Sequence, residues 1–453
     1  MKLSPSLIIS WVIAIVLTLT LFNQSKWNSR DVLKHDMYVY YSYLPATFIY
    51  NDLTFEFIHD LPPDDKREIW TLNAPNGNKV QKMTMGMAMM YAPFFGMAHL
   101  TAHLMDDVPA DGYSWVYHLF MALSALIFAL AAIFIQRKLL LKYFDEKTVS
   151  FTLLGIALGT NYYYYTTSEG PMSHIYNFFL ISLFVWQVIK WLEGFHWKNA
   201  IWVGLSFGLI VLIRPINAIV ILIPLFYGVR SFAEFVLRIK DVFSHYYQVL
   251  LMLTLIGLVI FPQLWYWHMN TGDWIYYSYN DEGFFFNDPR ILEGLFSFRK
   301  GWLIYAPVML FSIIGLFLLW IRSKASKFKI AILLYFIAHI YIIYSWWCWW
   351  YGGSFGSRPM IDATAILSIP LAAFIATSFN WKFTSWVSRI LIIGFVGLNL
   401  FQSMQYRRGI IHWDSMTKDS YFLVFGQSNY PEGYSESLKT PDYDAAKKGL
   451  RNE

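Results

Sequence analysis

Long apolar stretches recur from one end of the chain to the other, and this feature limits the possible folds most. A helix needs about 20 apolar residues to cross a bilayer. Only 14% of the residues are charged, against roughly 25% in soluble domains. The sequence therefore predicts an all-α polytopic membrane protein with about eleven transmembrane helices. The expected spans are residues 6–23, 115–136, 149–166, 172–191, 198–213, 215–229, 247–267, 302–321, 329–350, 360–379 and 386–405.

The distribution of Lys and Arg orients these spans, because short cytoplasmic loops of membrane proteins are rich in both residues. One set of loops carries the basic residues: Arg137, Lys138, Lys142, Lys147, Lys190, Lys198, Arg230, Arg238, Lys240, Arg322, Lys324, Lys327, Lys329, Lys382 and Arg389. If residues 85–104 also crossed the membrane, the cluster that begins at Arg137 would fall outside. We therefore expect 85–104 to form a surface helix on the outer face, interrupted by Pro93.

This topology predicts two regions with the N-terminus inside. Residues 1–405 form the transmembrane domain, whose first extracytoplasmic loop spans about 24–114 and contains surface helices, and residues 406–453 form a polar outer tail. No small-residue cleavage site follows Phe22-Asn23-Gln24, so the first span is expected to be retained. The predicted location is the inner (plasma) membrane, crossed several times. The basic loops account for the net charge of +5 without a nucleic-acid partner.

Two acids open the first outer loop and are the candidates for a catalytic base. On a helix, Asp36 shares a face with Tyr40 and Tyr43, whereas Asp31 points elsewhere. A carboxylate beside aromatic rings just outside the membrane suits a general base that accepts a proton from a bound acceptor. An ordinary solvated acid in an interfacial aromatic belt explains the same pattern. Asp36 is the first candidate, and Asp31 is the alternative.

Positively charged residues gather in the same outer regions and are candidates for binding a phosphate. They are Lys79, Lys82, His174, Arg214, Arg299, Lys300 and Arg358. Arg358 follows the Gly-rich run Gly352-Gly353-Ser354, whose backbone N–H groups would add to a phosphate cradle. Lipid anchoring by the lysines and snorkelling by Arg214 explain part of this set equally well. The sequence has one cysteine, Cys348, and no metal-ligand spacing, so no metal site is predicted.

The first span, the long outer loop with an early acid and a Tyr-rich helix, and the many later spans resemble the GT-C class of membrane glycosyltransferases. The likeness is closest to the branch of protein mannosyltransferases and lipid A aminoarabinose transferases. Asp36 matches the loop acid of that class, although the usual second acid is Met37 here. Lys79 or Lys82 resembles the loop lysine that contacts the donor phosphate.

The resemblance implies a sugar donor on a polyprenyl phosphate, an acceptor of unknown kind outside the cytoplasm, and inversion at the anomeric carbon. It implies no required cofactor, with a divalent ion such as Mg or Mn as an option. Two other functions stay open: a transporter or flippase of an anionic or lipid-linked substrate, and a polysaccharide polymerase or ligase. Charges at the outer ends of spans, rather than at the membrane midplane on repeated broken helices, favour the enzyme over the transporter.

Overall fold

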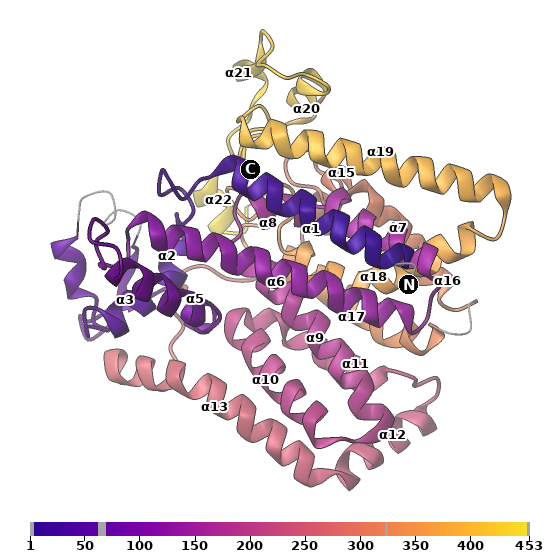
Figure 1. Ribbon diagram of the computed structural model, residues 1–453, viewed down its shortest axis with the longest axis horizontal. Helices are drawn as coiled ribbons and strands as arrows, with labels where there is room; N and C mark the ends of the chain where they lie inside the picture. The colour runs from indigo at the N-terminus through magenta and orange to yellow at the C-terminus, as the bar shows by residue number, and fades with distance from the viewer. Residues whose placement is uncertain (1–3, 62–68, 322–324, 451–453) are drawn as a thin grey trace.

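The computed structural model describes residues 4–61, 69–321 and 325–450, and nearly all of its regular structure is helical. The long helices run roughly side by side along the longest axis of the molecule (Figure 1). Arg322 and Lys324 of one predicted basic loop lie outside the described residues, as do residues 62–68 of the first outer loop and 451–453 of the tail.

Seven helices within the described ranges are long and apolar enough to cross a membrane. They are α1 (Pro5–Gln24), α6 (Trp115–Leu141), α9 (Ser173–Gly194), α13 (Tyr246–Thr271), η4 (Ser326–Phe328) continued by α17 (Lys329–Tyr344), α18 (Met360–Ser378) and α19 (Lys382–Arg407). The chain is therefore a multi-pass helical membrane protein, as its sequence predicts. The expected number of about eleven spans is not confirmed.

The four remaining predicted spans form shorter helices. Residues 149–166 divide into α7 (Glu146–Gly159) and α8 (Tyr162–Thr167), and residues 198–213 form α10 (Trp197–Ile213). Residues 215–229 form η2 (Pro215–Ile221) and α11 (Leu222–Phe226), and residues 302–321 divide into α15 (Trp302–Tyr305), η3 (Pro307–Met309) and α16 (Leu310–Leu318). Hydropathy located these apolar segments correctly but missed the breaks at Thr160 and Ala306, which fall inside two of them.

Proline and local side-chain bonds cause these two breaks and also the break at Arg214, which falls between two expected spans. Pro215 and Pro307 lack an N–H and push the preceding residue out of the helical conformation. Arg214 is accordingly extended, with φ −145° and ψ 99°. Thr160 ends α7 with φ −129° and ψ 174°, and the next side chain, Asn161, donates to the carbonyl of Phe355 in the Gly-rich turn. Two of the breaks thus help to hold residues of the candidate site.

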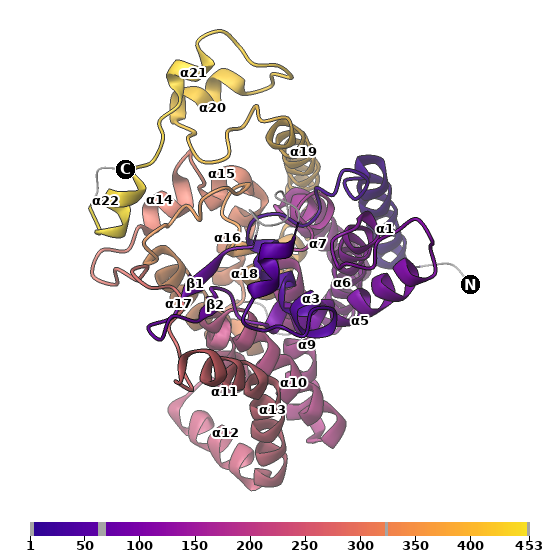
Figure 2. The same ribbon diagram turned by 90° about the vertical axis from the view of Figure 1, so that its left-hand side faces the viewer.

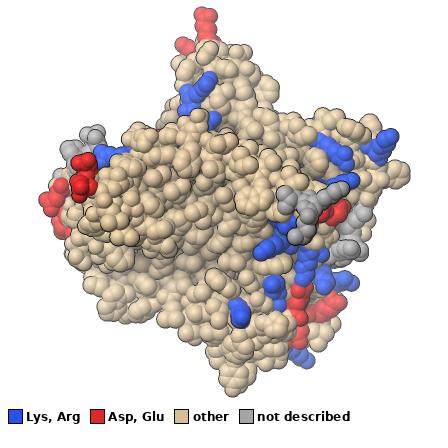
Figure 3. All heavy atoms as spheres, in the orientation of Figure 1, with Lys and Arg blue, Asp and Glu red and all other residues tan. Residues whose placement is uncertain are grey.

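The predicted first outer loop is a compact group of elements at one end of the molecule, on the left of Figure 1. It contains α2 (Asp36–Tyr41), α3 (Tyr43–Phe48), η1 (Glu56–Asp60), the antiparallel hairpin β1 (Thr71–Asn73) and β2 (Lys79–Gln81), and α5 (Gly86–His103). α5 covers the residues expected to form a surface helix, and it is not among the seven helices that are both long and apolar enough to cross a membrane. Pro93 lies inside α5 without interrupting it, which corrects the expectation. Many Lys and Arg side chains gather at the opposite, right-hand end of the molecule (Figure 3).

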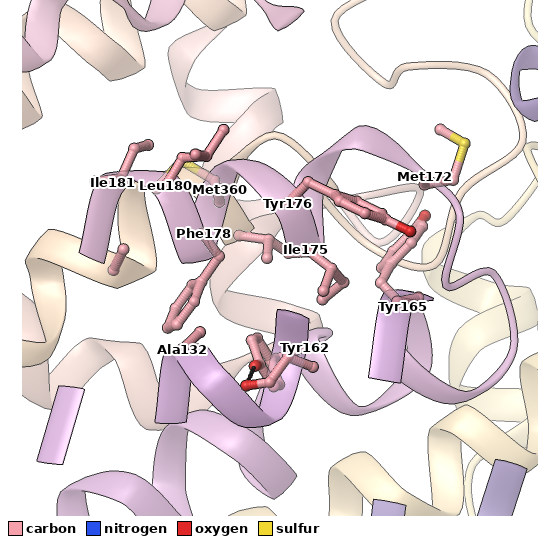
Figure 4. Packing of buried hydrophobic residues seen from close by; sticks show 14 of the residues in the cluster. Ala132, Tyr162, Tyr165, Met172, Ile175, Tyr176, Phe178, Leu180, Ile181 and Met360 are labelled. Atoms are coloured by element: carbon pink, nitrogen blue, oxygen red, sulfur yellow. Dashed lines mark hydrogen bonds between the residues drawn. The ribbon is translucent and has the colours of Figure 1, made fainter. Parts of the chain in front are cut away.

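The core of the bundle is built around α18, which lies in the middle when the molecule is viewed along its helices (Figure 2). Most of its residues are buried, and many are small Ala, Ser and Thr residues, which allow close helix packing. α18 packs against α16, α9 and α7. Aromatic rings of α8 and α9, such as Tyr162 and Phe178, fill the neighbouring layer (Figure 4) with centroids 4.8 Å apart.

Two shorter helices and the tail complete the described fold. α12 (Phe232–Ser244) lies between α11 and α13, and α14 (Ile291–Phe296) precedes α15. The predicted tail is folded and contains α20 (Lys418–Val424), α21 (Tyr434–Ser437) and α22 (Tyr443–Lys447). α20 and α21 project beyond α19, whereas α22 lies back against the loop that follows α13 (Figures 1 and 2).

Candidate active site

Asp36 and Arg358 form an ion pair between the first outer loop and the Gly-rich turn. Asp36 is the first residue of α2, and Arg358 lies two residues before α18. The guanidinium Nη2 donates to the Asp36 Oδ2 at 3.3 Å, and the side chains keep 17% and 22% of their surfaces exposed. The fold therefore brings together the first candidate acid and the arginine that follows the Gly-rich turn, and both side chains stay partly exposed.

Tyr40 lies one helical turn after Asp36 and is buried against the same charges. Burial, followed by the negative charge of Asp36, raises the pKa of its hydroxyl, while Arg214 and Arg358 act in the opposite direction. The phenol therefore stays protonated and can donate a hydrogen bond to an anionic group at the site. This agrees with the predicted position of Tyr40 on the Asp36 face.

Arg214 and His174 meet beside this pair around a third acid, Asp362. His174 Nδ1 lies 2.9 Å from one Asp362 oxygen, Arg214 Nε lies 3.6 Å from the other, and Asn217 also donates to Asp362. Arg214 Nη1 is 3.4 Å from His174 Nε2. The Arg214 side chain is 16% exposed, whereas His174 is fully buried. The Arg214 side chain is thus partly accessible to a ligand, whereas His174 is enclosed and contacts Asp362 and Arg214.

A further ion pair, between Lys82 and Glu282, lies beside Tyr279. Lys82 follows β2, and its ammonium donates to the Glu282 carboxylate and lies 5.2 Å from the centre of the Tyr279 ring. Tyr279 is buried close enough to Tyr40, Arg214 and Asp36 to interact with them electrostatically. Lys82 and Glu282 remain 24% and 15% exposed. Tyr279 thus connects the Lys82 pair with the Asp36–Arg358 pair.

Other predicted site residues have separate partners. Asp31 forms ion pairs with Lys26 at 3.6 Å and Lys34 at 3.5 Å. Lys79 pairs with Glu56 at 3.3 Å and contacts His59.

Tyr43 does not share a helix with Asp36, because α2 ends at Tyr41 and Tyr43 begins α3. Its hydroxyl donates to the carbonyl of Met83.

Arg299 and Lys300 are buried behind the Gly-rich turn. Arg299 Nη1 donates to the carbonyl of Asp414 at 2.6 Å, and the Lys300 ammonium donates to the carbonyls of Ser354 and Trp413. Burial, helped by the nearby charges of Arg299 and Arg358, lowers the pKa of Lys300 to about 7. These contacts join the turn to the tail, with both side chains directed to backbone rather than to the surface.

The Gly-rich turn places its glycines in unequal surroundings. Gly352 has a φ of +60°, yet a Cβ there would meet nothing within 4 Å, and Gly353 would meet only the Trp413 ring at 3.4 Å. Gly356 has a φ of +58°, and a Cβ there would lie 2.6 Å from the Asn161 amide and 2.8 Å from Tyr305. Ser354 is buried and bonds within the turn. Gly356 is therefore the glycine of this turn at which a side chain would collide with neighbouring protein atoms, whereas Gly352 and Gly353 have room for one.

Sequence reasoning missed two acids and an amide of this region: Asp362, Asn217 and Glu282. Asp362 could have been found, because a carboxylate in an apolar helix four residues after Arg358 is rare and needs a cationic partner. Glu282 carried no comparable signal, since it lies in a polar loop. Among the described residues no group of three or more His, Cys, Asp or Glu side chains forms a possible metal site.

No family model matches the sequence, and no curated protein matches it. Solved structures do match the fold. The oligosaccharyltransferase of Archaeoglobus fulgidus in the apo form gives a TM-score of 0.50 at 14% identity, covering 96% of this chain and 60% of that one. The complex of that enzyme with Zn and sulfate gives a TM-score of 0.49 at 15% identity, covering 96% of this chain and 57% of that one. The oligosaccharyltransferase AglB of the same organism, in complex with an inhibitory peptide and a dolichol-phosphate, gives a TM-score of 0.48 at 12% identity. That match covers 96% of this chain and 56% of the AglB chain.

This chain therefore spans about 60% of the length of the apo enzyme. Nearly all of it takes part in the match, so the likeness extends over the whole bundle. It supports a fold of the GT-C type and does not single out the mannosyltransferase and aminoarabinose transferase branch.

Proposed function

We propose that this protein is a glycosyltransferase that moves a sugar from a polyprenyl-phosphate carrier to an acceptor outside the cytoplasm. The observation that carries the proposal is the Asp36–Arg358 pair: a possible base and a possible phosphate ligand, 3.3 Å apart and both partly exposed. Arg214 and Lys82 add positive charge close by, and Tyr40 adds a protonated hydroxyl. A fold shared with an archaeal oligosaccharyltransferase supports the same class of reaction.

The ion pair explains how one small site serves both ends of the reaction. Without substrate, each charge compensates the other. A donor phosphate competes for the Arg358 guanidinium, which binds phosphate oxygens bidentately. Asp36 then loses its counter-charge and becomes free to accept a proton. Binding of the donor thus prepares the base.

The chemical step is a displacement with inversion. The acceptor oxygen or nitrogen attacks the anomeric carbon, and its proton passes to the Asp36 carboxylate. The bond between that carbon and the phosphate oxygen breaks, and the lipid phosphate leaves with the bonding electrons. Arg358, with Arg214 and Lys82, stabilises the charge that grows on the phosphate as the sugar departs. No metal is needed to balance this step.

The site is proposed to face the extracytoplasmic side, because the basic loops favour the opposite end of the bundle for the cytoplasm. Single cysteines at Ser428 and Lys142, in a Cys348→Ser background, test this with a membrane-impermeant reagent. Ser428 should react from outside, and Lys142 should not. The reverse pattern would refute the orientation.

The test of the reaction is incubation of the purified protein with defined polyprenyl-phosphate and polyprenyl-diphosphate sugars, with donor loss followed by mass spectrometry. We expect the monophosphate donor to be consumed and the free lipid phosphate to appear. Consumption of the diphosphate donor alone would favour a polymerase or ligase. Movement of an intact lipid-linked sugar between leaflets, without cleavage, would favour a flippase.

The role of Asp36 is tested by Asp36→Asn, with Asp31→Asn as the matched control. Loss of a general base typically lowers turnover about 10²–10⁴-fold. Asp36→Asn should show this loss and still bind donor, since Arg358 is then unpaired. Asp31→Asn should stay close to wild type, because Asp31 pairs with Lys26 and Lys34. The opposite result would transfer the role to Asp31.

A further inference from the structure

An open hollow lies at the turn between α9 and α10, near the inner ends of the bundle as the basic loops orient it. Its volume is about 600 Å³, and it is lined by Lys190, Glu193, Gly194, His196, Trp197, Lys198 and Asn199. The site proposed above uses none of these residues. Both lysines and Trp197 are exposed.

The charge of this hollow favours an anion. Glu193 is the single acid of the lining, and it pairs with the Lys142 ammonium. Lys190 and Lys198 therefore leave an excess of positive charge, and His196 adds a donor. Trp197, 53% exposed, is the kind of side chain that lies at the level of lipid headgroups.

A neighbouring helix supplies a face for the lipid surface. α12 has no buried residue, and its side chains Phe232, Val236 and Phe243 are 80%, 37% and 69% exposed. Their spacing of four and seven residues puts all three on one face of the helix. Arg238, Lys240 and Asp241 lie on the other faces. This pattern is typical of a helix that lies in a membrane interface with its apolar face towards the acyl chains.

The hollow and α12 are directly connected. The Phe195 ring stacks on His245, the residue after α12, with ring centroids 3.7 Å apart. Gln248 of α13 bonds both to the carbonyl of Phe195 and to the indole of Trp191. The apolar face of α12 is followed by the exposed Leu250, Leu253 and Leu258 of α13, a helix long enough to span a membrane. The cationic hollow thus borders a surface of exposed apolar side chains.

We infer that the hollow at the α9–α10 turn binds the phosphate headgroup of an anionic membrane lipid, while the apolar face of α12 lies in the adjacent headgroup–acyl boundary. Lys190 and Lys198 contact the phosphate, and Trp197 lies beside the glycerol region. A lipid headgroup is favoured over a soluble anion because the hollow opens next to the apolar surface where acyl chains are present.

The test uses the full chain in nanodiscs of phosphatidylcholine with and without phosphatidylglycerol. After mild extraction, native mass spectrometry counts the phosphatidylglycerol that stays bound. Each basic residue near a membrane surface contributes about 1 kcal/mol to binding anionic lipid. Lys190→Gln/Lys198→Gln should therefore retain about tenfold to thirtyfold less phosphatidylglycerol. The matched control is Lys418→Gln/Lys439→Gln, which removes two exposed lysines of the tail and should change nothing.

Two outcomes would overturn the inference. One is equal retention by the hollow variant and the tail variant. The other is displacement of the lipid by millimolar inorganic phosphate, which would make the hollow a site for soluble anions. The position of α12 is checked with an environment-sensitive dye on a cysteine at Val236 or at Asp241, in the Cys348→Ser background. The dye should report an apolar environment at Val236 and water at Asp241. A signal of water at Val236 would show that α12 does not lie in the membrane interface.

Discussion

At the scale of single residues, Arg358 is the side chain whose chemistry the proposed reaction uses most fully. A lysine at this position keeps the positive charge but loses the planar, bidentate geometry for phosphate. We expect Arg358→Lys to lower turnover roughly tenfold and Arg358→Ala about 10²–10³-fold, as removal of a transition-state donor does. Donor consumption and donor binding measure both effects. Wild-type turnover in a correctly folded Arg358→Ala protein would move the phosphate site elsewhere.

Asp362 is expected to position Arg214 rather than to touch substrate. Its carboxylate is buried between His174, Arg214 and Asn217, so Asp362→Asn removes the counter-charge of Arg214. We expect turnover to fall about tenfold and the effect to depend on Arg214, with a coupling of about 0.5–3 kcal/mol in a double-mutant cycle with Arg214→Gln.

Thr364→Val is the matched control for Asp362, since Thr364 is buried two residues further along α18 and bonds to its own helix. Thermal unfolding monitors folding of every variant in the cycle. Additive effects of Asp362→Asn and Arg214→Gln would mean that Asp362 does not act through Arg214.

At the scale of elements, the Gly-rich turn depends on Gly356 more than on its neighbours. Alanine at Gly356 would combine a left-handed backbone, which costs roughly 1–2 kcal/mol, with contacts to Asn161 and Tyr305 below 3 Å. Gly352→Ala has only the cost of the left-handed backbone, and Gly353→Ala has neither that cost nor a contact below 3 Å. Thermal unfolding midpoints in one detergent should therefore fall in the order Gly353→Ala, Gly352→Ala, Gly356→Ala, with Gly356→Ala the least stable. An equally stable Gly356→Ala protein would contradict the tight packing of the turn.

The positions of the helices show which parts of the fold can be predicted from the sequence. Length and hydropathy located α1, α6, α9, α13, α17, α18 and α19, because a membrane demands a continuous apolar helix. They could not locate the breaks at Thr160 and Ala306, since an averaged hydropathy window does not register one non-helical residue. The Asp36–Tyr40 relation followed from helical spacing, whereas Tyr43 was misplaced because α2 ends before it. The Asp36–Arg358 contact joins distant segments, and no local pattern encodes it.

At the scale of the whole molecule, Lys300 connects the tail with the turn that carries Arg358, and it should make stability depend on pH. Its folded-state pKa of about 7 lies below the ordinary value for lysine of 10.5. Between these two values the unfolded chain binds a proton that the folded chain does not, so stability rises with pH in this window. Below pH 7 Lys300 is protonated in both the folded and the unfolded chain, so this residue no longer makes stability depend on pH.

Lys300→Met removes this titration. The difference in unfolding midpoint between wild type and Lys300→Met should therefore shift in favour of wild type as the pH rises from 7 to about 10. Lys418→Met, an exposed lysine of the tail, serves as the control and should show no such shift. A constant difference over this range would mean that Lys300 stays charged in the folded protein.

The Asp36–Arg358 ion pair can form only late in synthesis, because its two residues lie far apart in the sequence. Asp36 and Arg358 are 322 positions apart, and ribosomes add about 5–20 residues per second. Asp36 is therefore synthesised roughly 15 to 65 s before the arginine that neutralises it. During that interval the first outer loop carries an uncompensated carboxylate beside incomplete helices. A nascent chain arrested before Arg358 should expose its first loop to protease, and release of the last spans should protect it.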